Sequence, residues 1–104
     1  MQRAEVLKSI RDALAGAYGR RLRGILLYGS EARGEARADS DIDVLVLLDR
    51  VTDYAGEIRR CLDALYPLAS ELDRRISPKP AAAQEYETVD CPLYRRIHAE
   101  GIAA

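Results

Sequence analysis

The chain has 104 residues, of which 48% are hydrophobic and 32% charged, and its formal net charge is −1. These values are typical of one compact globular domain over residues 1–104, and they exclude an intrinsically disordered or collagen-like chain. Sixteen Lys and Arg side chains stand against 17 Asp and Glu side chains. This balance argues against a general nucleic-acid-binding surface, so we expect no direct binding of nucleic acid.

No segment of the sequence suggests secretion or a membrane span. The first residues mix charged with apolar side chains, unlike a signal peptide, and the longest apolar run, Val44–Leu48, is far too short to cross a bilayer. Cys61, Cys91 and the one histidine, His98, do not have the spacing of metal ligands. We therefore expect a cytoplasmic protein with two reduced thiols.

The first half of the chain predicts a helix followed by two strands. Apolar residues recur at helical spacing over residues 3–17. Residues 22–28 are rich in Ile and Leu and stop at a glycine, which favours a strand. Residues 30–40 have no apolar pattern and predict a loop, with room for one helical turn at 30–33. Residues 41–48 predict a second strand, whose continuous apolar tail is typical of a strand covered on both faces.

The second half predicts helix, strand and helix. Thr52 or Asp53 can cap the first of these helices, and Pro67 should kink or split it. Its expected apolar stripe is Ile58, Cys61, Leu62, Leu65, Ala69 and Leu72. A third strand is expected over residues 73–77, ending before Pro78 and Pro80 because proline removes a donor from the sheet. A last helix is expected over residues 91–100. The order α-β-β-α-β-α predicts an α/β (α+β) fold: a small mixed β-sheet with helices packed against it.

Two aspartates stand one residue apart at the head of the second predicted strand. Side chains alternate along a strand, so Asp41 and Asp43 should share a face. Two unit charges about 4 Å apart repel by roughly 4 kcal/mol at an effective dielectric of 20. A cation between the carboxylates removes that cost. Mg²⁺ fits best, since it binds one or two carboxylates and completes its shell with phosphate oxygens and water.

A glycine-serine pair precedes the aspartates at the end of the first predicted strand. Gly29 allows a phosphate to approach the backbone closely, and the hydroxyl of Ser30 can donate a hydrogen bond to it. Taken alone, such a pair is usually only a turn, and an isolated Asp-x-Asp is often a solvated or capping pair. A calcium loop is excluded, because Val44 and Arg50 stand where it requires glycine and glutamate.

Together the two motifs are far more specific. Gly29-Ser30-x-Ala32-Arg33-Gly34 followed by Asp39-Ser40-Asp41-Ile42-Asp43 resembles the signature of the polymerase-β-like nucleotidyltransferase superfamily. In length and motif spelling the chain resembles the minimal nucleotidyltransferases, the MNT proteins (MntA-type antitoxins) encoded beside helical HEPN partners. The resemblance implies a polymerase-β palm-like nucleotidyltransferase fold and one minimal nucleotidyltransferase domain over residues 1–104.

The resemblance also implies a reaction. A Mg²⁺-dependent enzyme of this family would transfer a nucleoside monophosphate, AMP from ATP, to a hydroxyl group on a HEPN-type toxin. Asp41 and Asp43 would hold the metal, Gly29 and Ser30 the triphosphate, and Arg33, with Arg37 as a further candidate, would offset charge on the leaving pyrophosphate. The sequence leaves open whether the protein forms a homo-oligomer.

The family's third carboxylate, which assists the acceptor hydroxyl, has no clear counterpart. Ile76 should face the helices, so Asp73, Arg75 and Ser77 should face the cleft, and we expect Asp73 to be the catalytic carboxylate. Glu71 is the fallback. If neither reaches the site, the alternative is an interaction module with this fold that neutralises its partner by binding.

Overall fold

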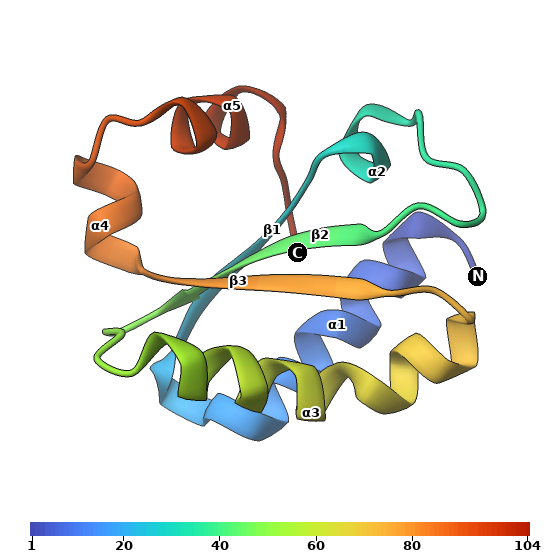
Figure 1. Cartoon of the computed structure of the whole chain (residues 1–104), viewed down its shortest axis with the longest axis horizontal. Coiled ribbons are helices and arrows are strands. Elements are labelled where there is room, and N and C mark those ends of the chain that lie inside the picture. Colours follow the sequence, from blue (N-terminus) through green and yellow to red (C-terminus); the bar gives the residue numbers. More distant parts are fainter.

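The computed structural model describes residues 1–104 as one mixed sheet with helices on both faces (Figure 1). Its elements are α1 (Arg3–Tyr18), the 3-10 turn η1 (Gly19–Arg21), β1 (Leu22–Tyr28), α2 (Ser30–Arg33), β2 (Ile42–Leu48), α3 (Tyr54–Leu72), β3 (Ile76–Ala82), α4 (Ala83–Thr88), α5 (Pro92–Glu100) and β4 (Ile102–Ala103). The strand order is β3-β2-β1-β4. β2 is antiparallel to β1 and parallel to β3, and β4 is antiparallel to β1. The expected α/β (α+β) fold is confirmed.

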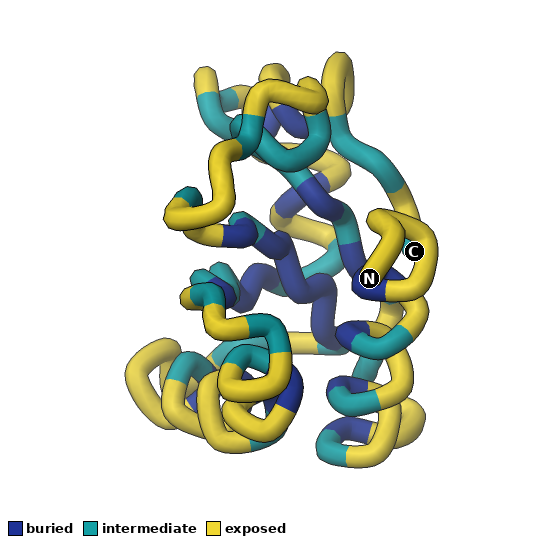
Figure 2. Tube along the Cα trace, turned by 90° about the vertical axis from the view of Figure 1, so that its right-hand side faces the viewer, coloured by how far each residue is buried: buried dark blue, intermediate teal, exposed yellow.

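The larger core lies between the sheet and the helix pair α1 and α3. Ile10 and Leu14 of α1 and Leu65 of α3 are fully buried there, against the alternate residues Val44 and Val46 of β2. Burial of this kind contributes about 25 cal/mol per Å² of apolar surface. The dark central strands of Figure 2, between yellow outer helix surfaces, show that the sheet is the most buried layer.

The buried stripe of α3 differs from the predicted one. Asp53 caps the helix by accepting a hydrogen bond from Gly56 N–H at 3.1 Å. Leu62 is 46% exposed, whereas Leu68 is buried, because the helix turns its Glu57-Cys61-Leu65-Leu68 face to the core. Pro67 does not split the helix, which is continuous to Leu72.

A partly buried ionic cluster joins α3 to the rest of the first layer. Arg21 binds the carboxylates of Asp49 (3.1 Å) and Glu57. Tyr18 donates from its hydroxyl to Glu57, whose residue is only 8% exposed. The hydrogen bonds to Glu57 and Asp49 raise the pKa of Arg21. The cluster fixes the junction of α1, β2 and α3.

The second face of the sheet is covered over only part of its length. Leu45 and Leu47 of β2 pack against Tyr86 of α4 and Tyr94 and Ile97 of α5. The sequence does not predict α4 or the two-residue strand β4, because both are too short to show a period.

α5 begins at Pro92, within one residue of the predicted start. No helix combines the length and the apolarity needed to span a membrane.

The predicted bounds of the third strand are wrong. β3 starts at Ile76 and runs through Pro78 and Pro80 to Ala82. β3 is the edge strand and pairs only with β2. Prolines at alternate positions can therefore turn their missing donors to the free side without breaking the ladder. Asp73 lies before the strand, as the C-terminal cap of α3 in a left-handed conformation (φ 52°).

Candidate functional site

The two aspartates lie at the start of β2. They are on the same side of the sheet as α4 and α5, which pack on Leu45 and Leu47 further along the strand. Ile42 and Val44 are buried in the first core, so Asp43 between them points to the opposite face. Asp43 pairs in register with Tyr28 on β1 and with Ser77 on β3. Asp41 immediately precedes the strand, and its carboxylate lies 3.4 Å from the hydroxyl of Ser77, which donates to it. Ser77 therefore lies beside both carboxylates.

The turn between β1 and α2 packs directly against Asp43. Gly29 has φ 75°, a conformation that side chains rarely allow. A Cβ atom at Gly29 would come within 2.5 Å of Asp43 Oδ2. Both constraints require glycine at this position. Ser30 follows as the first residue of the single-turn helix α2, so the chain brings the Gly29-Ser30 turn and Asp43 together.

The surroundings of Asp43 disfavour its negative charge. Burial raises the pKa of the Asp43 carboxyl, the charge of Asp41 raises it further, and the charge of Arg33 opposes the rise. Neither aspartate forms an ion pair. Two neighbouring carboxylates of like charge, one of them partly buried and neither with a cationic partner, fit a hard divalent cation. No third Asp, Glu, His or Cys joins them in a group that could hold a metal ion.

Arg33 lies near Asp43 and is shared between two glutamates. Its guanidinium binds Glu35 at 3.2 Å and Glu100, at the end of α5, at 3.4 Å. These hydrogen bonds, that of Glu35 first, raise its pKa. Arg33 thus links α2 to α5 across the uncovered part of the sheet, although in sequence the two elements are far apart.

A second arginine, which sequence reasoning missed, anchors the loop before β2. Arg74 donates to the carbonyl oxygen of Ser40 from Nε (3.1 Å) and Nη2 (2.9 Å) and pairs with Glu31 of α2. Ser40 in turn accepts a hydrogen bond from the backbone N–H of Arg37 at 2.9 Å. The sequence spacing of Arg74, Ser40 and Glu31 gives no indication of these contacts, because the three residues belong to separate elements.

The structure does not bring Asp73 to the aspartate pair. Asp73 is exposed and lines a surface hollow with Tyr66 and Arg75, and neither Asp41 nor Asp43 borders that hollow. Glu71 is exposed on α3, whose packing is against the other face of the sheet. The alternation that would put Asp73 on the cleft side requires that residue to lie inside the strand. The chain reaches the strand only at Ile76.

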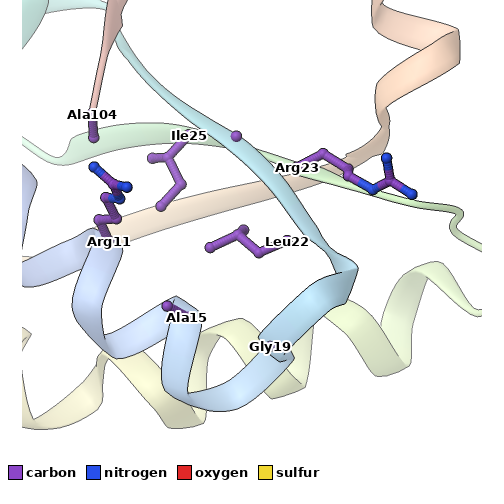
Figure 3. Close-up of a pocket in the computed structure, with 8 residues that line it drawn as sticks. Arg11, Ala15, Gly19, Leu22, Arg23, Ile25 and Ala104 are labelled. Carbon is purple, nitrogen blue, oxygen red and sulfur yellow. The ribbon is translucent and has the colours of Figure 1, made fainter.

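Two of the surface hollows border the face of the sheet that carries Asp43: a larger one of about 500 Å³, whose lining includes Leu47, Tyr86 and Ile97, and a smaller one near the end of β3. The smaller one has a volume of about 380 Å³ and is lined by Val51, Tyr54, Lys79, Pro80, Ala81, Ala82, Glu85 and Tyr94. Another, of about 280 Å³, lies under β1 beside α1 and is lined by Arg11, Ala15, Gly19, Leu22, Arg23, Gly24, Ile25 and Ala104 (Figure 3). This hollow beside α1 is on the far side of the sheet from the aspartates and has no part in the site.

A mixed sheet with two carboxylates at one strand end and a glycine-serine turn beside them is the architecture of a nucleotidyl-transfer domain. The chain belongs to the nucleotidyltransferase domain family, whose model matches residues 7–100. A candidate protein adenylyltransferase of Methanocaldococcus jannaschii is 39% identical over 58 residues, which is 56% of this chain and 58% of that protein. The match therefore covers less than two thirds of that relative's length.

Solved structures with the same fold come from toxin–antitoxin complexes. A chain of a toxin–antitoxin crystallised with AMP-PNP superposes with a TM-score of 0.68 at 23% identity, over 92% of this chain and 69% of that chain. A chain of a complex between a tri-AMPylated Shewanella oneidensis HEPN toxin and an MNT antitoxin gives 0.65 at 20% identity, over 98% and 71%. These likenesses confirm the nucleotidyltransferase fold.

Proposed function

We propose that this protein is a Mg²⁺-dependent nucleotidyltransferase that moves AMP from ATP to a hydroxyl group of a HEPN-type toxin. Family membership, the relative from M. jannaschii and the fold shared with toxin–antitoxin chains support the proposal. Such a reaction consumes ATP and acts on a toxin inside the cell, so it belongs in the cytoplasm. In this proposal the domain over residues 1–104 carries the nucleotide-binding and metal-binding residues.

Each site residue has a role that its position suits. Asp41 and Asp43 hold the cation from the open face of the sheet. When bound, Mg²⁺ offsets charge on the phosphates and stabilises the displacement at phosphorus. Gly29 leaves room for the phosphate chain beside Asp43, and Ser30 donates to it. Arg33 exchanges a glutamate for a phosphate oxygen of the leaving group.

The observation that carries the proposal is that neither Asp43, which lies against the Gly29 turn, nor the neighbouring Asp41 has an ion-pair partner. Asp43 is partly buried against that turn and is not neutralised by any side chain. A protein gains nothing in stability from such an arrangement. It becomes favourable when a cation and a phosphate group occupy the site.

Labelled ATP tests the proposal directly. The protein is incubated with α-labelled ATP, Mg²⁺ and the HEPN-type protein encoded beside it, and label is followed on both proteins. We expect label on the partner with the wild type and none with Asp43→Asn. Absence of ATP binding to the wild type in the presence of Mg²⁺ would refute the proposal.

One observation favours a second function, neutralisation of the partner by binding alone. β3 has no acidic residue, and no third carboxylate joins Asp41 and Asp43. A general base typically contributes about 10²–10⁴-fold in rate. Transfer could then need a base from the partner, or be lost. Asp73→Ala and Glu71→Ala separate these cases: loss of transfer in either variant, with ATP still bound, identifies the base. ATP binding and toxin neutralisation without any transfer by the wild type would establish the binding module.

A further inference from the structure

Lys79 stands on the same face of the sheet as the aspartate pair. Ser77 and Lys79 are alternate residues of β3, paired in register with Asp43 and Leu45 of β2. Alternate residues of a strand share a face, so Lys79 follows Ser77 along that face, about 7 Å further on. The family's third carboxylate is absent from this strand, and a cation occupies its exposed face instead.

The charge of Lys79 has no carboxylate partner. Its ammonium donates to the hydroxyl of Tyr54 at 3.5 Å and lies 5.5 Å from the centre of that ring. Arg33 and Arg74, the other cations of the site, are each bound to glutamates. Lys79 is therefore the half-buried cation of the site that is held only by a neutral aromatic group.

Lys79 borders an open hollow that extends from it toward the end of β3, and neither Asp41 nor Asp43 lines that hollow. Tyr54, Lys79 and Tyr94 line about 380 Å³ of space at the surface. Tyr28 is the register partner of Asp43 on β1. Burial is the main cause that raises the pKa of its hydroxyl, and the charges of Asp43 and Tyr54 raise it further.

We propose that Lys79 binds the α-phosphate of the nucleotide, on the β3 side of the aspartate pair. This inference rests on the proposed function. In the strand order β3-β2-β1, Asp43 lies between Lys79 on one side and the Gly29-Ser30 turn on the other. With the phosphate tail at the turn, the phosphate nearest β3 is the one that joins the nucleoside to the leaving pyrophosphate. A free ammonium beside it forms a charge-assisted hydrogen bond.

The composition of the chain offers a direct test, because Lys8 and Lys79 are its two lysines. Lys8 is exposed on α1, on the opposite side of the sheet. The protein is labelled sparsely with acetic anhydride, with and without MgATP at a concentration shown by calorimetry to fill the site, and each lysine is read by peptide mass spectrometry. We expect ATP to slow labelling of Lys79 at least fivefold and to leave Lys8 unchanged. AMP at a concentration that fills the site should protect Lys79 equally.

Variants give a second readout that does not depend on transfer. Lys79→Met should weaken MgATP binding at least tenfold, about 1.4 kcal/mol, with an unchanged melting temperature. Lys79→Arg should bind within threefold of the wild type, and Lys8→Met should bind as the wild type does. Unprotected Lys79 at saturating ATP, protection by pyrophosphate equal to that by ATP, or unaltered binding by Lys79→Met overturns the inference and leaves the proposed function standing. A wild type that binds no ATP overturns both.

Discussion

Asp43 is the residue at which stability and proposed function oppose each other. Its carboxyl is partly buried, lies near a second carboxyl, and has its pKa raised by both circumstances. A fold that needed only a sheet would place a neutral side chain there. Gly29, which alone leaves space for the Asp43 carboxylate, shows that the surrounding chain accommodates this charge.

Asp43→Asn should separate the two properties. The amide keeps the shape of the side chain but is a neutral and therefore weaker ligand for a metal ion, so Mg²⁺-dependent ATP binding should fall at least tenfold in calorimetry. The free energy of unfolding should stay the same or rise by up to about 1 kcal/mol, since partial exposure screens the repulsion. Asp12→Asn, on the exposed face of α1, is the matched control. A fall of several degrees in the melting temperature of metal-free Asp43→Asn would mean that the carboxylate is structural.

The raised pKa of Asp43 predicts a pH dependence with a definite sign. Between its ordinary value of 3.8 and the higher folded-state value, the folded protein keeps a proton that the unfolded chain has lost. The free energy of unfolding therefore falls as pH rises through this window. The cost is complete above the folded-state pKa and absent below 3.8. Any stability advantage of Asp43→Asn over the wild type should appear at about pH 7 and vanish near about pH 3.5 in paired denaturation curves. An advantage that grew as the pH fell would contradict this assignment.

At the scale of single residues, the sequence predicted what strand alternation controls. Asp41 and Asp43 lie near each other at the strand start, and Ile76 faces the first core as expected. The position of Asp73 could not be predicted, because it depends on where α3 ends. The helix continues past Pro67, and Asp73 adopts a left-handed cap conformation that is uncommon for a residue other than glycine.

Among the elements, the turn from β1 to α2 gives the sharpest test. Gly29→Ala forces a side chain into a left-handed conformation and against Asp43 Oδ2. We expect a loss of about 1–3 kcal/mol of stability and loss of ATP binding, measured by denaturation and calorimetry. Gly16 lies inside α1, and a methyl group added there would have no atom within 4 Å, so Gly16→Ala should stabilise by about 0.5–1 kcal/mol. Equal effects of the two substitutions would show that the turn is not constrained.

The elements themselves were predictable in proportion to their length. α1, β1 and β2 have clear periods and appear close to their expected bounds. The end of β3 is missed in the sequence because prolines normally stop a strand, and only the sheet order shows that β3 has a free side. α4 and β4 have six and two residues, too few for a period to emerge.

For the molecule as a whole, the Arg21 cluster is a polar link that holds α3 against α1 and the end of β2. In Arg21→Met, Glu57 would keep its buried carboxylate but lose its cation, and we expect a loss of about 2–3 kcal/mol in the free energy of unfolding. Arg20→Met, at an exposed neighbour without an ion pair, should change little. The double variant Arg21→Met/Glu57→Met should recover most of the loss, because it removes the unpaired charge. Failure to recover would assign the loss to packing of the arginine stem.

The mixed sheet with helices was predictable from the order of its elements, whereas the links between distant elements were not. Arg74 with Ser40, and Arg33 with Glu100, join residues whose proximity follows only from the completed fold. Charged side chains at such places look like ordinary surface residues in the sequence.

The prolines of β3 also limit how this molecule can assemble with others. A sheet is extended when the free N–H and C=O groups of its edge strand form hydrogen bonds with a new strand. Pro78 and Pro80 have no backbone N–H group to donate. The edge nearest the aspartates is therefore closed to strand addition. A protein that delivers its hydroxyl group from this side must be recognised by side chains, which makes the match between the two partners a matter of surface chemistry rather than of shared backbone.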